Sequence, residues 1–159
     1  MRKKILLVLV VFSMLLVVGC SPSTKTFSGS GISIELNGGF IEKEVIQAPI
    51  YLESTNHIFM GARELKSEVE SMGINNLRQY IEAVLSNSGH TATVELYEED
   101  GVMYYFAYYT ATVDREYGYM LFVMQGEHHF YTMNFGCLEK NLESNKTKYH
   151  NWAQTVTVE

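Results

Sequence analysis

Basic residues are scarce in this 159-residue sequence, which has 12 Lys and Arg against 18 Asp and Glu and a formal net charge of −6. The first 19 residues contain three of the basic residues and no acidic one, so without them the charge is 9 − 18 = −9. Binding to nucleic acid requires clustered positive charge. The composition therefore excludes a nucleic-acid partner, and it predicts repulsion from anionic lipid headgroups.

Long hydrophobic runs are also lacking. The longest, Ile5–Val18, has about 14 residues, whereas a transmembrane helix needs roughly 20. Arg2, Lys3 and Lys4 precede this run, and a basic start followed by a short apolar segment is typical of a secretory signal peptide. We therefore predict a signal peptide over residues 1–19 rather than a membrane-spanning helix.

Cysteine occurs only at Cys20 and Cys137. The segment Val17–Cys20 resembles the bacterial lipobox, in which a small residue precedes an obligatory cysteine. The resemblance implies cleavage before Cys20 and transfer of a diacylglyceryl group to its sulfur; the alternative is an ordinary signal peptide with a chance cysteine. With Cys20 modified, Cys137 has no intramolecular partner, so the domain must be stable without a disulfide.

The lipobox interpretation predicts an extracytoplasmic protein that is anchored to the cell membrane through the lipid on Cys20. Ser21 follows the cysteine, so an outer-membrane location is open if the host is Gram-negative. We expect residues 20–26 to form the lipidated N-terminus and a short polar tether, and residues 27–159 to form one globular domain. The membrane is the partner that the sequence predicts, and the lipid chains are expected to hold the protein there.

The pattern of apolar residues predicts a mixed fold of the α+β class. Three strands are expected before the middle of the chain, over residues 27–36, 50–54 and 58–65. Residues 66–73 are charged and irregular, and we interpret them as a loop.

Two helices are predicted. The clearer one spans residues 75–88, where apolar residues recur at the spacing of one helical face. Asn75 or Asn76 can cap its start and Gly89 can end it. The second helix lies near the C-terminus and carries these residues on one face: Leu142, Tyr149, Trp152, Ala153 and Val156.

The most regular part of the sequence predicts an antiparallel β-sheet with a four-stranded C-terminal meander, over residues 91–98, 102–113, 117–125 and 128–137. The two middle strands are apolar on both faces, whereas a sheet with one face in water alternates apolar and polar residues. We therefore expect both faces of the meander to be covered, one by the central helix and one by the C-terminal helix.

Three segments resemble the PsbP-like family: Ile32–Gly39, Leu77–Ile81 and Lys148–Val156. The order of strands, helix, meander and closing helix extends the resemblance over most of residues 27–159. The family includes the extrinsic oxygen-evolving protein of photosystem II, a Ran-binding nuclear import factor and many bacterial lipoproteins. The resemblance implies an α/β sandwich and an accessory or binding role rather than a shared enzymatic activity. It implies no functional residue, because no functional motif is matched.

Histidine and carboxylate groups give weak candidates for a metal site. Glu127, His128 and His129 are consecutive, but neighbouring residues on a strand point to opposite faces of a sheet. A metal would therefore need distant partners, drawn from His57, His90 and His150. The stretch Glu98–Gly101 lacks the length and the alternating oxygen ligands of an EF-hand loop. We interpret both stretches as polar hairpin ends and predict no metal and no cofactor.

Candidates for catalysis or modification are equally weak. Cys137 ends an apolar strand, where a buried free cysteine is a simpler interpretation than a nucleophile. Asn145–Thr147 matches a glycosylation sequon, which we interpret as a chance match on a helix surface. The sequence contains no phosphate-binding glycine-rich loop, nucleophile elbow or zinc signature. No catalytic residue is predicted, and the site residue that the sequence does predict is Cys20, for lipidation.

Tyrosine is abundant, with 11 residues, and these members of the group lie in or beside the meander: Tyr104, Tyr105, Tyr108, Tyr109, Tyr117, Tyr119 and Tyr131. Tyrosine suits half-buried positions, since its ring packs while its hydroxyl meets water. Packing of the two sheet faces is the first interpretation. An aromatic groove for a partner or a ligand is the functional alternative.

Three functions are compatible with these observations. The first is a non-enzymatic accessory or binding domain held at the outer face of a membrane. The second is a hydrolase acting on envelope material, which converging histidine and carboxylate groups would favour and dispersed histidines would disfavour. The third is a solute-binding lipoprotein that serves a transporter, for which a mature chain of about 140 residues is small beside the usual two-lobed binder.

Overall fold

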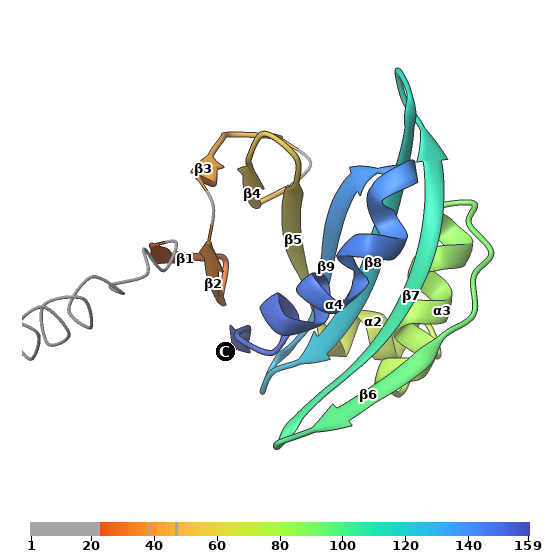
Figure 1. Cartoon of the computed structure of the whole chain (residues 1–159). Coiled ribbons are helices and arrows are strands. Elements are labelled where there is room, and N and C mark those ends of the chain that lie inside the picture. The colour runs from red at the N-terminus through yellow and green to blue at the C-terminus, as the bar shows by residue number, and fades with distance from the viewer. Residues whose placement is uncertain (1–22, 38, 47) are drawn as a thin grey trace, which may run out of the picture.

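The computed structural model describes residues 23–37, 39–46 and 48–159, so the predicted signal peptide and Cys20 lie outside the described residues. The described chain forms a three-stranded sheet and a seven-stranded sheet, with helices on both faces of the larger one (Figure 1). The predicted α+β class is therefore confirmed.

The elements follow one another as β1 (Thr24–Gly29), β2 (Ile32–Asn37), β3 (Ile41–Glu42), β4 (Ile50–Glu53), β5 (Ile58–Leu65), α2 (Lys66–Ser71), α3 (Leu77–Asn87), β6 (Glu95–Glu99), β7 (Val102–Thr112), β8 (Glu116–Gln125), β9 (His129–Leu138), the 3₁₀ turn η2 (Glu139–Asn141), α4 (Leu142–Ala153) and β10 (Thr157–Val158). The strand order is β1-β2-β10 in the smaller sheet and β3-β4-β5-β9-β8-β7-β6 in the larger, with antiparallel pairing throughout. In the described part of the chain, no helix combines the length and apolarity needed to cross a membrane.

In the three-stranded sheet, two predictions differ from the structure. The single strand expected over residues 27–36 is a hairpin, because Ser30 and Gly31 adopt φ values of 52° and 73° and turn the chain back. Such positive φ angles match the twist of a tight hairpin. β1 begins at Thr24, so residues 24–26, predicted as part of the tether, are strand residues that pair with the end of β2.

The predicted loop over residues 66–73 is wrong from Lys66 to Ser71, which form the short helix α2. Val69 is the one buried residue of this helix and is 1% exposed. One buried apolar residue produces no periodic pattern in the sequence. The helix could therefore not be predicted from the charged residues around Val69.

The ends of α3 were predicted correctly. The Asn76 side chain accepts a hydrogen bond from the backbone N–H of Gln79 at 2.9 Å, as an N-cap does. At the other end Gly89 has φ 72°, and the His90 N–H donates to the Leu85 carbonyl at 2.9 Å. These bonds close the helix in a Schellman motif.

The four-stranded meander is confirmed as β6 to β9, although β6 begins at Glu95, later than the expected residue 91. The β6–β7 turn carries Asp100 and Gly101 at φ 53° and 81°, the conformation that an Asp-Gly hairpin favours. The interpretation of Glu98–Gly101 as a polar hairpin end is therefore confirmed.

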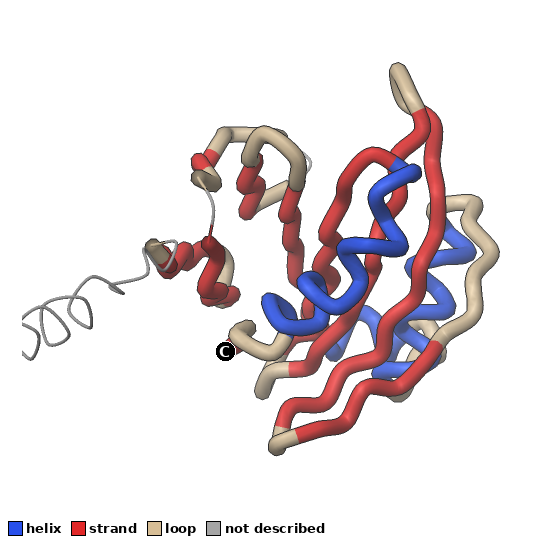
Figure 2. The backbone as a smooth tube through the Cα atoms, in the orientation of Figure 1, coloured by secondary structure: helices blue, strands red, loops and turns tan. Residues whose placement is uncertain are grey.

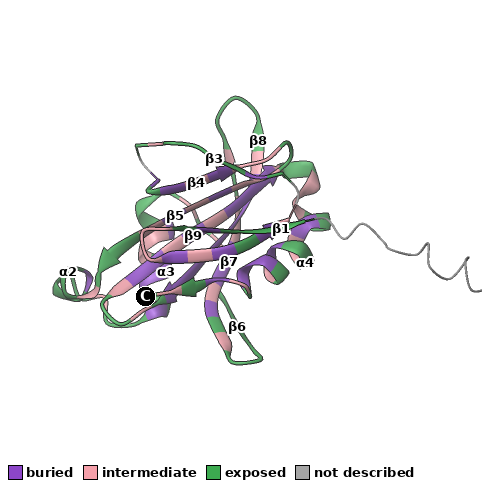
Figure 3. Cartoon of the chain, turned by 90° about the vertical axis from the view of Figure 1, so that its left-hand side faces the viewer, coloured by how far each residue is buried: buried purple, intermediate pink, exposed green. Residues whose placement is uncertain are grey.

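Both faces of the meander are covered, as expected. α4 crosses one face, and α2 and α3 lie on the other (Figures 1 and 2). β8 lies between these layers, and every residue from Gly118 to Met124 is buried (Figure 3). The core on the α4 side is rich in aromatic residues and includes Phe59, Tyr104, Phe122, Phe135, Tyr149 and Trp152. The core on the α3 side is smaller and includes Val69, Leu77, Tyr80, Ile81, Leu85, Leu121, Val123 and Phe130.

Candidate functional site

The histidines considered as metal ligands are dispersed. His128 lies at the β8–β9 turn with its ring nitrogen 3.6 Å from Glu127, and the two side chains are 75% and 83% exposed. Three other histidines pack against aromatic rings: His57 on Trp152, His90 on Tyr109 and His150 on Phe106. Within the described residues, no group of three or more His, Cys, Asp and Glu side chains could hold a metal ion.

Cys137 lies in the core beneath α4 and is 2% exposed. It sits beside the hydroxyl of Tyr149, and burial raises the pKa of that phenol well above its ordinary value. The interpretation of Cys137 as a buried free cysteine is confirmed. The predicted surface position of Asn145 is wrong. Asn145 is buried, and its side-chain amide donates to the Asn141 carbonyl at 2.9 Å.

Several of the predicted tyrosines pack the α4 face of the sheet. Tyr104 and Tyr131 are fully buried, and the Tyr131 hydroxyl donates to the Glu159 carbonyl at 3.0 Å. The hydroxyls of Tyr104 and Tyr108 lie 2.7 and 2.9 Å from the two ring nitrogens of His150. For these residues packing is the role that the structure shows.

A second group of tyrosines lies on the opposite face of the sheet, on the part that α3 leaves open. We define the tyrosine face as Tyr51 on β4, Tyr109 on β7, and Tyr117 and Tyr119 on β8. Tyr109 and Tyr119 are cross-strand partners, and their rings stack with centroids 5.1 Å apart. Tyr117 extends the row, its ring centroid 6.2 Å from that of Tyr119. Tyr51, Tyr109 and Tyr117 are half-buried.

Gly136 on β9 shapes this face. It is the cross-strand partner of Tyr119, and a Cβ at residue 136 would lie 2.7 Å from Tyr119 Cε1. The Tyr119 ring therefore lies across the glycine and reaches toward β5. Beside it, the Tyr109 hydroxyl donates to Asn134 Oδ1 at 3.1 Å. The absence of a side chain at residue 136 is what allows the aromatic row to lie flat on the sheet.

Three phenols of the tyrosine face, those of Tyr51, Tyr109 and Tyr119, are neutral hydrogen-bonding groups. Burial raises the pKa of Tyr109 to about 12, and it also raises the pKa values of Tyr51 and Tyr119. Among the described residues, the hydroxyls of Tyr51, Tyr117 and Tyr119 have no hydrogen-bond partner, whereas that of Tyr109 does. Aromatic rings with free hydroxyls are enriched where proteins bind one another.

A separate cleft of about 280 Å³ opens on the α4 side of the molecule. Its lining comes from three segments that are distant in the sequence: Asn37 at the end of β2; Ser54, Thr55, Asn56 and His57 between β4 and β5; and Lys148 and Trp152 on α4. We call it the Lys148 cleft. No sequence pattern indicates this cleft, since no two of the three segments are neighbours along the chain.

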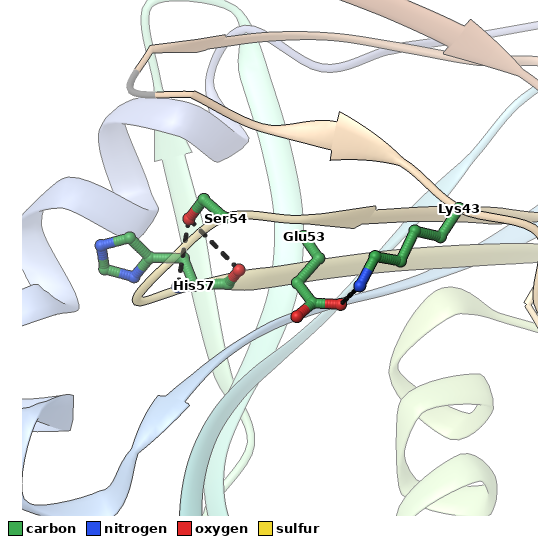
Figure 4. Close-up of polar contacts among 4 residues, drawn as sticks. All are labelled: Lys43, Glu53, Ser54 and His57. Atoms are coloured by element: carbon green, nitrogen blue, oxygen red, sulfur yellow. Dashed lines mark hydrogen bonds and ion pairs between the residues drawn. The ribbon is translucent and has the colours of Figure 1, made fainter.

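The turn between β4 and β5 is held by local hydrogen bonds. The Ser54 backbone N–H donates to the His57 carbonyl at 2.8 Å, and the His57 N–H donates to Ser54 Oγ at 3.2 Å. Figure 4 shows the His57 imidazole directed away from the Lys43–Glu53 ion pair, whose nitrogen and oxygen are 2.6 Å apart. The turn thus places His57 in the cleft and leaves the ion pair outside it.

His57 is held by aromatic residues and one hydroxyl. Its ring meets Trp152 edge-on at 5.2 Å, and its Nδ1 lies 3.1 Å from the Tyr149 hydroxyl. Its Nε2 is 3.5 Å from Lys148 Nζ. Burial, and then the positive charge of Lys148, lower the pKa of His57 to about 4. The imidazole is therefore neutral at physiological pH.

This low pKa predicts a loss of stability in mild acid. Lowering the pH from 7 to 5 is expected to reduce the free energy of unfolding by about 1 kcal/mol through His57, after discounting for its partial exposure. The stability falls because His57 has a pKa of 6.5 in the unfolded chain and of about 4 in the folded chain. Between these pH values, the unfolded chain binds a proton at His57 and the folded chain does not. Burial also lowers the pKa of His150, which acts in the same direction. Urea unfolding at both pH values measures the change.

A histidine variant isolates the contribution of His57. His57→Gln is expected to reduce the difference between pH 7 and pH 5, whereas His128→Gln, at an exposed position, is expected to leave it unchanged. If His57→Gln shows the full wild-type difference, the assignment of a neutral buried imidazole is wrong.

Comparisons with known proteins inform the fold. No family model matches this chain, and no curated protein matches it. Among solved structures, the chain is similar to the solution structure of cyanobacterial PsbP (CyanoP) from Synechocystis sp. PCC 6803, with a TM-score of 0.57 and 15% sequence identity. The match covers 90% of this chain and 96% of the cyanobacterial one. At this identity the similarity confirms the PsbP-like fold predicted from the sequence and establishes the fold alone.

Proposed function

We propose that this protein is a lipid-anchored accessory protein of the cell envelope that binds a protein partner through the tyrosine face. A diacylglyceryl group on Cys20 would hold it at the membrane, since two acyl chains give stable anchoring where one does not. β1 begins at Thr24, four residues after Cys20, and four extended residues span about 14 Å. The folded domain would therefore stay close to the bilayer and meet partners there.

The observation that carries the binding role is the tyrosine face itself. Its four phenols come from three strands, and the rings of Tyr109 and Tyr119 stack while that of Tyr117 lies tilted beside Tyr119. Among the described residues, the hydroxyls of Tyr51, Tyr117 and Tyr119 have no hydrogen-bond partner and are available to a protein partner. Tyrosine contributes much to binding energy at protein interfaces, because a rigid ring and a hydroxyl are presented at low cost in conformational entropy. The opposite face of the sheet is covered by α4, whereas Tyr51, Tyr109 and Tyr117 are each partly exposed. Tyr119 is 8% exposed and supports the row from within it.

The alternative of an envelope hydrolase finds less support. Acid–base catalysis needs a histidine or carboxylate within hydrogen-bonding reach of a reacting group, usually with a second group to orient it. Among the described residues, the one contact between a histidine and a carboxylate joins His128 and Glu127, and both side chains are largely exposed. Dispersed histidines of this kind favour a binding role.

Photocrosslinking in cells tests the proposed surface. A photoreactive phenylalanine analogue at Tyr117 is expected to form a covalent adduct with one envelope protein, because this side chain lies half-buried at the edge of the aromatic row. The same analogue at Glu143, whose side chain is 85% exposed on α4, serves as the control and is expected to give no such adduct. Mass spectrometry of the adducts identifies the partner.

A glycine variant links the adduct to the tyrosine face. Gly136→Ala places a Cβ against the Tyr119 ring, so the ring must leave its position and the adduct yield at Tyr117 is expected to fall at least fivefold. An adduct that forms equally at Glu143, or that survives Gly136→Ala undiminished, would contradict binding through this surface. Circular dichroism shows whether the variant stays folded.

A further inference from the structure

Lys148 is an exposed cation in an acidic protein. It forms no ion pair with any carboxylate among the described residues, a property that it shares with Lys25, Lys66 and Lys140, but of these four lysines it alone lines the cleft. Its ammonium group lies 5.8 Å from the centre of the Trp152 ring. Since acidic residues outnumber basic ones in the chain, an unpaired lysine on the wall of a cleft is positioned to attract an anion from outside.

Polar groups converge on the same cleft. His57 Nε2 lies 3.5 Å from Lys148 Nζ. Because the ammonium group can only donate, Nε2 is the acceptor and the imidazole proton is on Nδ1, directed to the Tyr149 hydroxyl. The Trp152 indole N–H donates to Asn37 Oδ1 at 3.1 Å, so the Asn37 amide nitrogen is left as a donor. An acceptor placed in the cleft would be met by the positive charge of Lys148 and by the amide N–H groups of Asn37.

The remaining wall favours the same ligand chemistry. Ser54, Thr55 and Asn56 add hydroxyl and amide groups, and no carboxylate lines the cleft. The nearest acid along the chain, Glu53, pairs with Lys43 outside it (Figure 4). A volume of about 280 Å³ exceeds that of a phosphate ion and leaves room for part of an esterified group. The chemistry fits a compact oxyanion, of which phosphate is the form that membranes present.

The cleft also lies beside the start of β1, the end of the domain that a lipid on Cys20 would hold near the membrane. Asn37, which forms part of its wall, is the cross-strand partner of Thr24, the first residue of β1. Cross-strand Cα atoms are about 5 Å apart, and four extended residues separate Thr24 from Cys20 over at most about 14 Å. A lipid on Cys20 would therefore hold the bilayer surface within about 20 Å of the cleft.

We propose that the Lys148 cleft binds the phosphate group of a membrane phospholipid and so orients the domain on the bilayer. The proposal rests on the lipid anchor of the proposed function, which brings the cleft to the headgroups. The net charge opposes diffuse adhesion to an anionic surface, so the contact depends on this cleft rather than on the surface as a whole. Orientation by the cleft would leave the tyrosine face in a constant direction for its partner.

Trp152 reports directly on the cleft, because it is the only tryptophan in the chain and lines the cleft wall. The full chain, purified in an uncharged detergent, is titrated with short-chain phosphatidylglycerol while Trp152 fluorescence is followed. We expect a saturable change, and we expect Lys148→Gln to weaken the apparent affinity at least tenfold. Lys140→Gln, which removes an equal charge from an exposed position on η2, is expected to change the affinity less than twofold.

Two further titrations identify the ligand. A diacylglycerol with the same acyl chains but no phosphate is expected to give no saturable change. Inorganic phosphate is expected to bind at least tenfold more weakly than the lipid; equal binding would assign the cleft to free phosphate and overturn the headgroup proposal. The proposal also fails if Lys148→Gln binds the lipid like the wild type. The titration requires neither membrane insertion nor the tyrosine face, so its failure is distinct from failure of the proposed function.

Discussion

A Phe135→Ala variant is expected to lose about 3–5 kcal/mol of unfolding free energy, the range found when a buried aromatic ring is removed from a packed core. Phe135 is fully buried at the centre of β9. Its ring stacks on Phe122 and Tyr149, with centroids 5.3 and 5.0 Å away, and meets Phe59 and Trp152 at 5.2 and 5.6 Å. Domains of this size have roughly 5–15 kcal/mol in total, so the expected loss is a large fraction of the whole.

Urea unfolding measures the loss. Phe135→Leu fills part of the same volume and is expected to cost less than the alanine variant, which separates lost packing from a general sensitivity of β9. Val113→Ala, at a position 79% exposed in the β7–β8 turn, is expected to change the free energy by less than about 0.5 kcal/mol. A loss below about 1 kcal/mol for Phe135→Ala would show that the α4-side core is not the main source of stability.

A Cys20→Ala variant is expected to move nearly all of the protein from the membrane fraction to the soluble fraction, or to halt its processing at the uncleaved precursor. The physical reason is that each buried methylene of a lipid chain contributes about 0.8 kcal/mol to membrane binding, and the protein without lipid carries an excess of negative charge. One phospholipid contact at the Lys148 cleft could not replace two acyl chains. Detergent phase partition of the expressed protein measures the effect.

Cys137→Ala is the matched control, because it removes the other cysteine of the chain from a buried position. It is expected to remain in the detergent phase with wild-type processing. If Cys20→Ala partitions into detergent and matures normally, the lipobox interpretation is wrong and another feature holds the protein at the membrane.

The part of the fold that the sequence predicted best is the part built from local contacts. β6 to β9 follow one another along the chain and pair with their neighbours, so alternation and turn residues such as Asp100 and Gly101 carry most of the information. The caps of α3 are local as well: Asn76 and Gly89 act within one turn of the helix. The coverage of both sheet faces was also predictable, since β8 is apolar on each of them.

The elements that escaped prediction depend on distant partners. β10 has two residues, Thr157 and Val158, and exists as a strand because β2 pairs with it from the other end of the chain. α2 is held by the burial of Val69 under the sheet rather than by its own pattern. The turn at Ser30 and Gly31 was missed for a local reason. It interrupts a run whose apolar and polar residues alternate as they do in one continuous strand.

The candidate sites were predictable only in part. An aromatic groove was one of two interpretations of the tyrosines, but residue types alone did not divide them into a packed set and an open set. Tyr51 belongs to the tyrosine face because β4 lies in the same sheet as β8, with β5 and β9 between them. The sequence alone does not predict that strand order. The Lys148 cleft is a purely tertiary feature, since Asn37, His57 and Lys148 are more than 19 residues apart and meet at the junction of three elements.

The N-terminal hairpin has a mechanical consequence. Thr24 and Asn37 form the open end of the β1–β2 ladder. A pull on the proposed lipid at Cys20 would therefore separate the two strands one residue pair after another, and this geometry resists tension less than sliding the strands lengthwise. Phe27 is the only buried residue of β1. Detaching the strand would free the chain up to Gly29 and lengthen the link from Cys20 to Ser30 to about 33–36 Å. With the proposed anchor in place, the first strand would serve under tension as extra tether that refolds when the force is released.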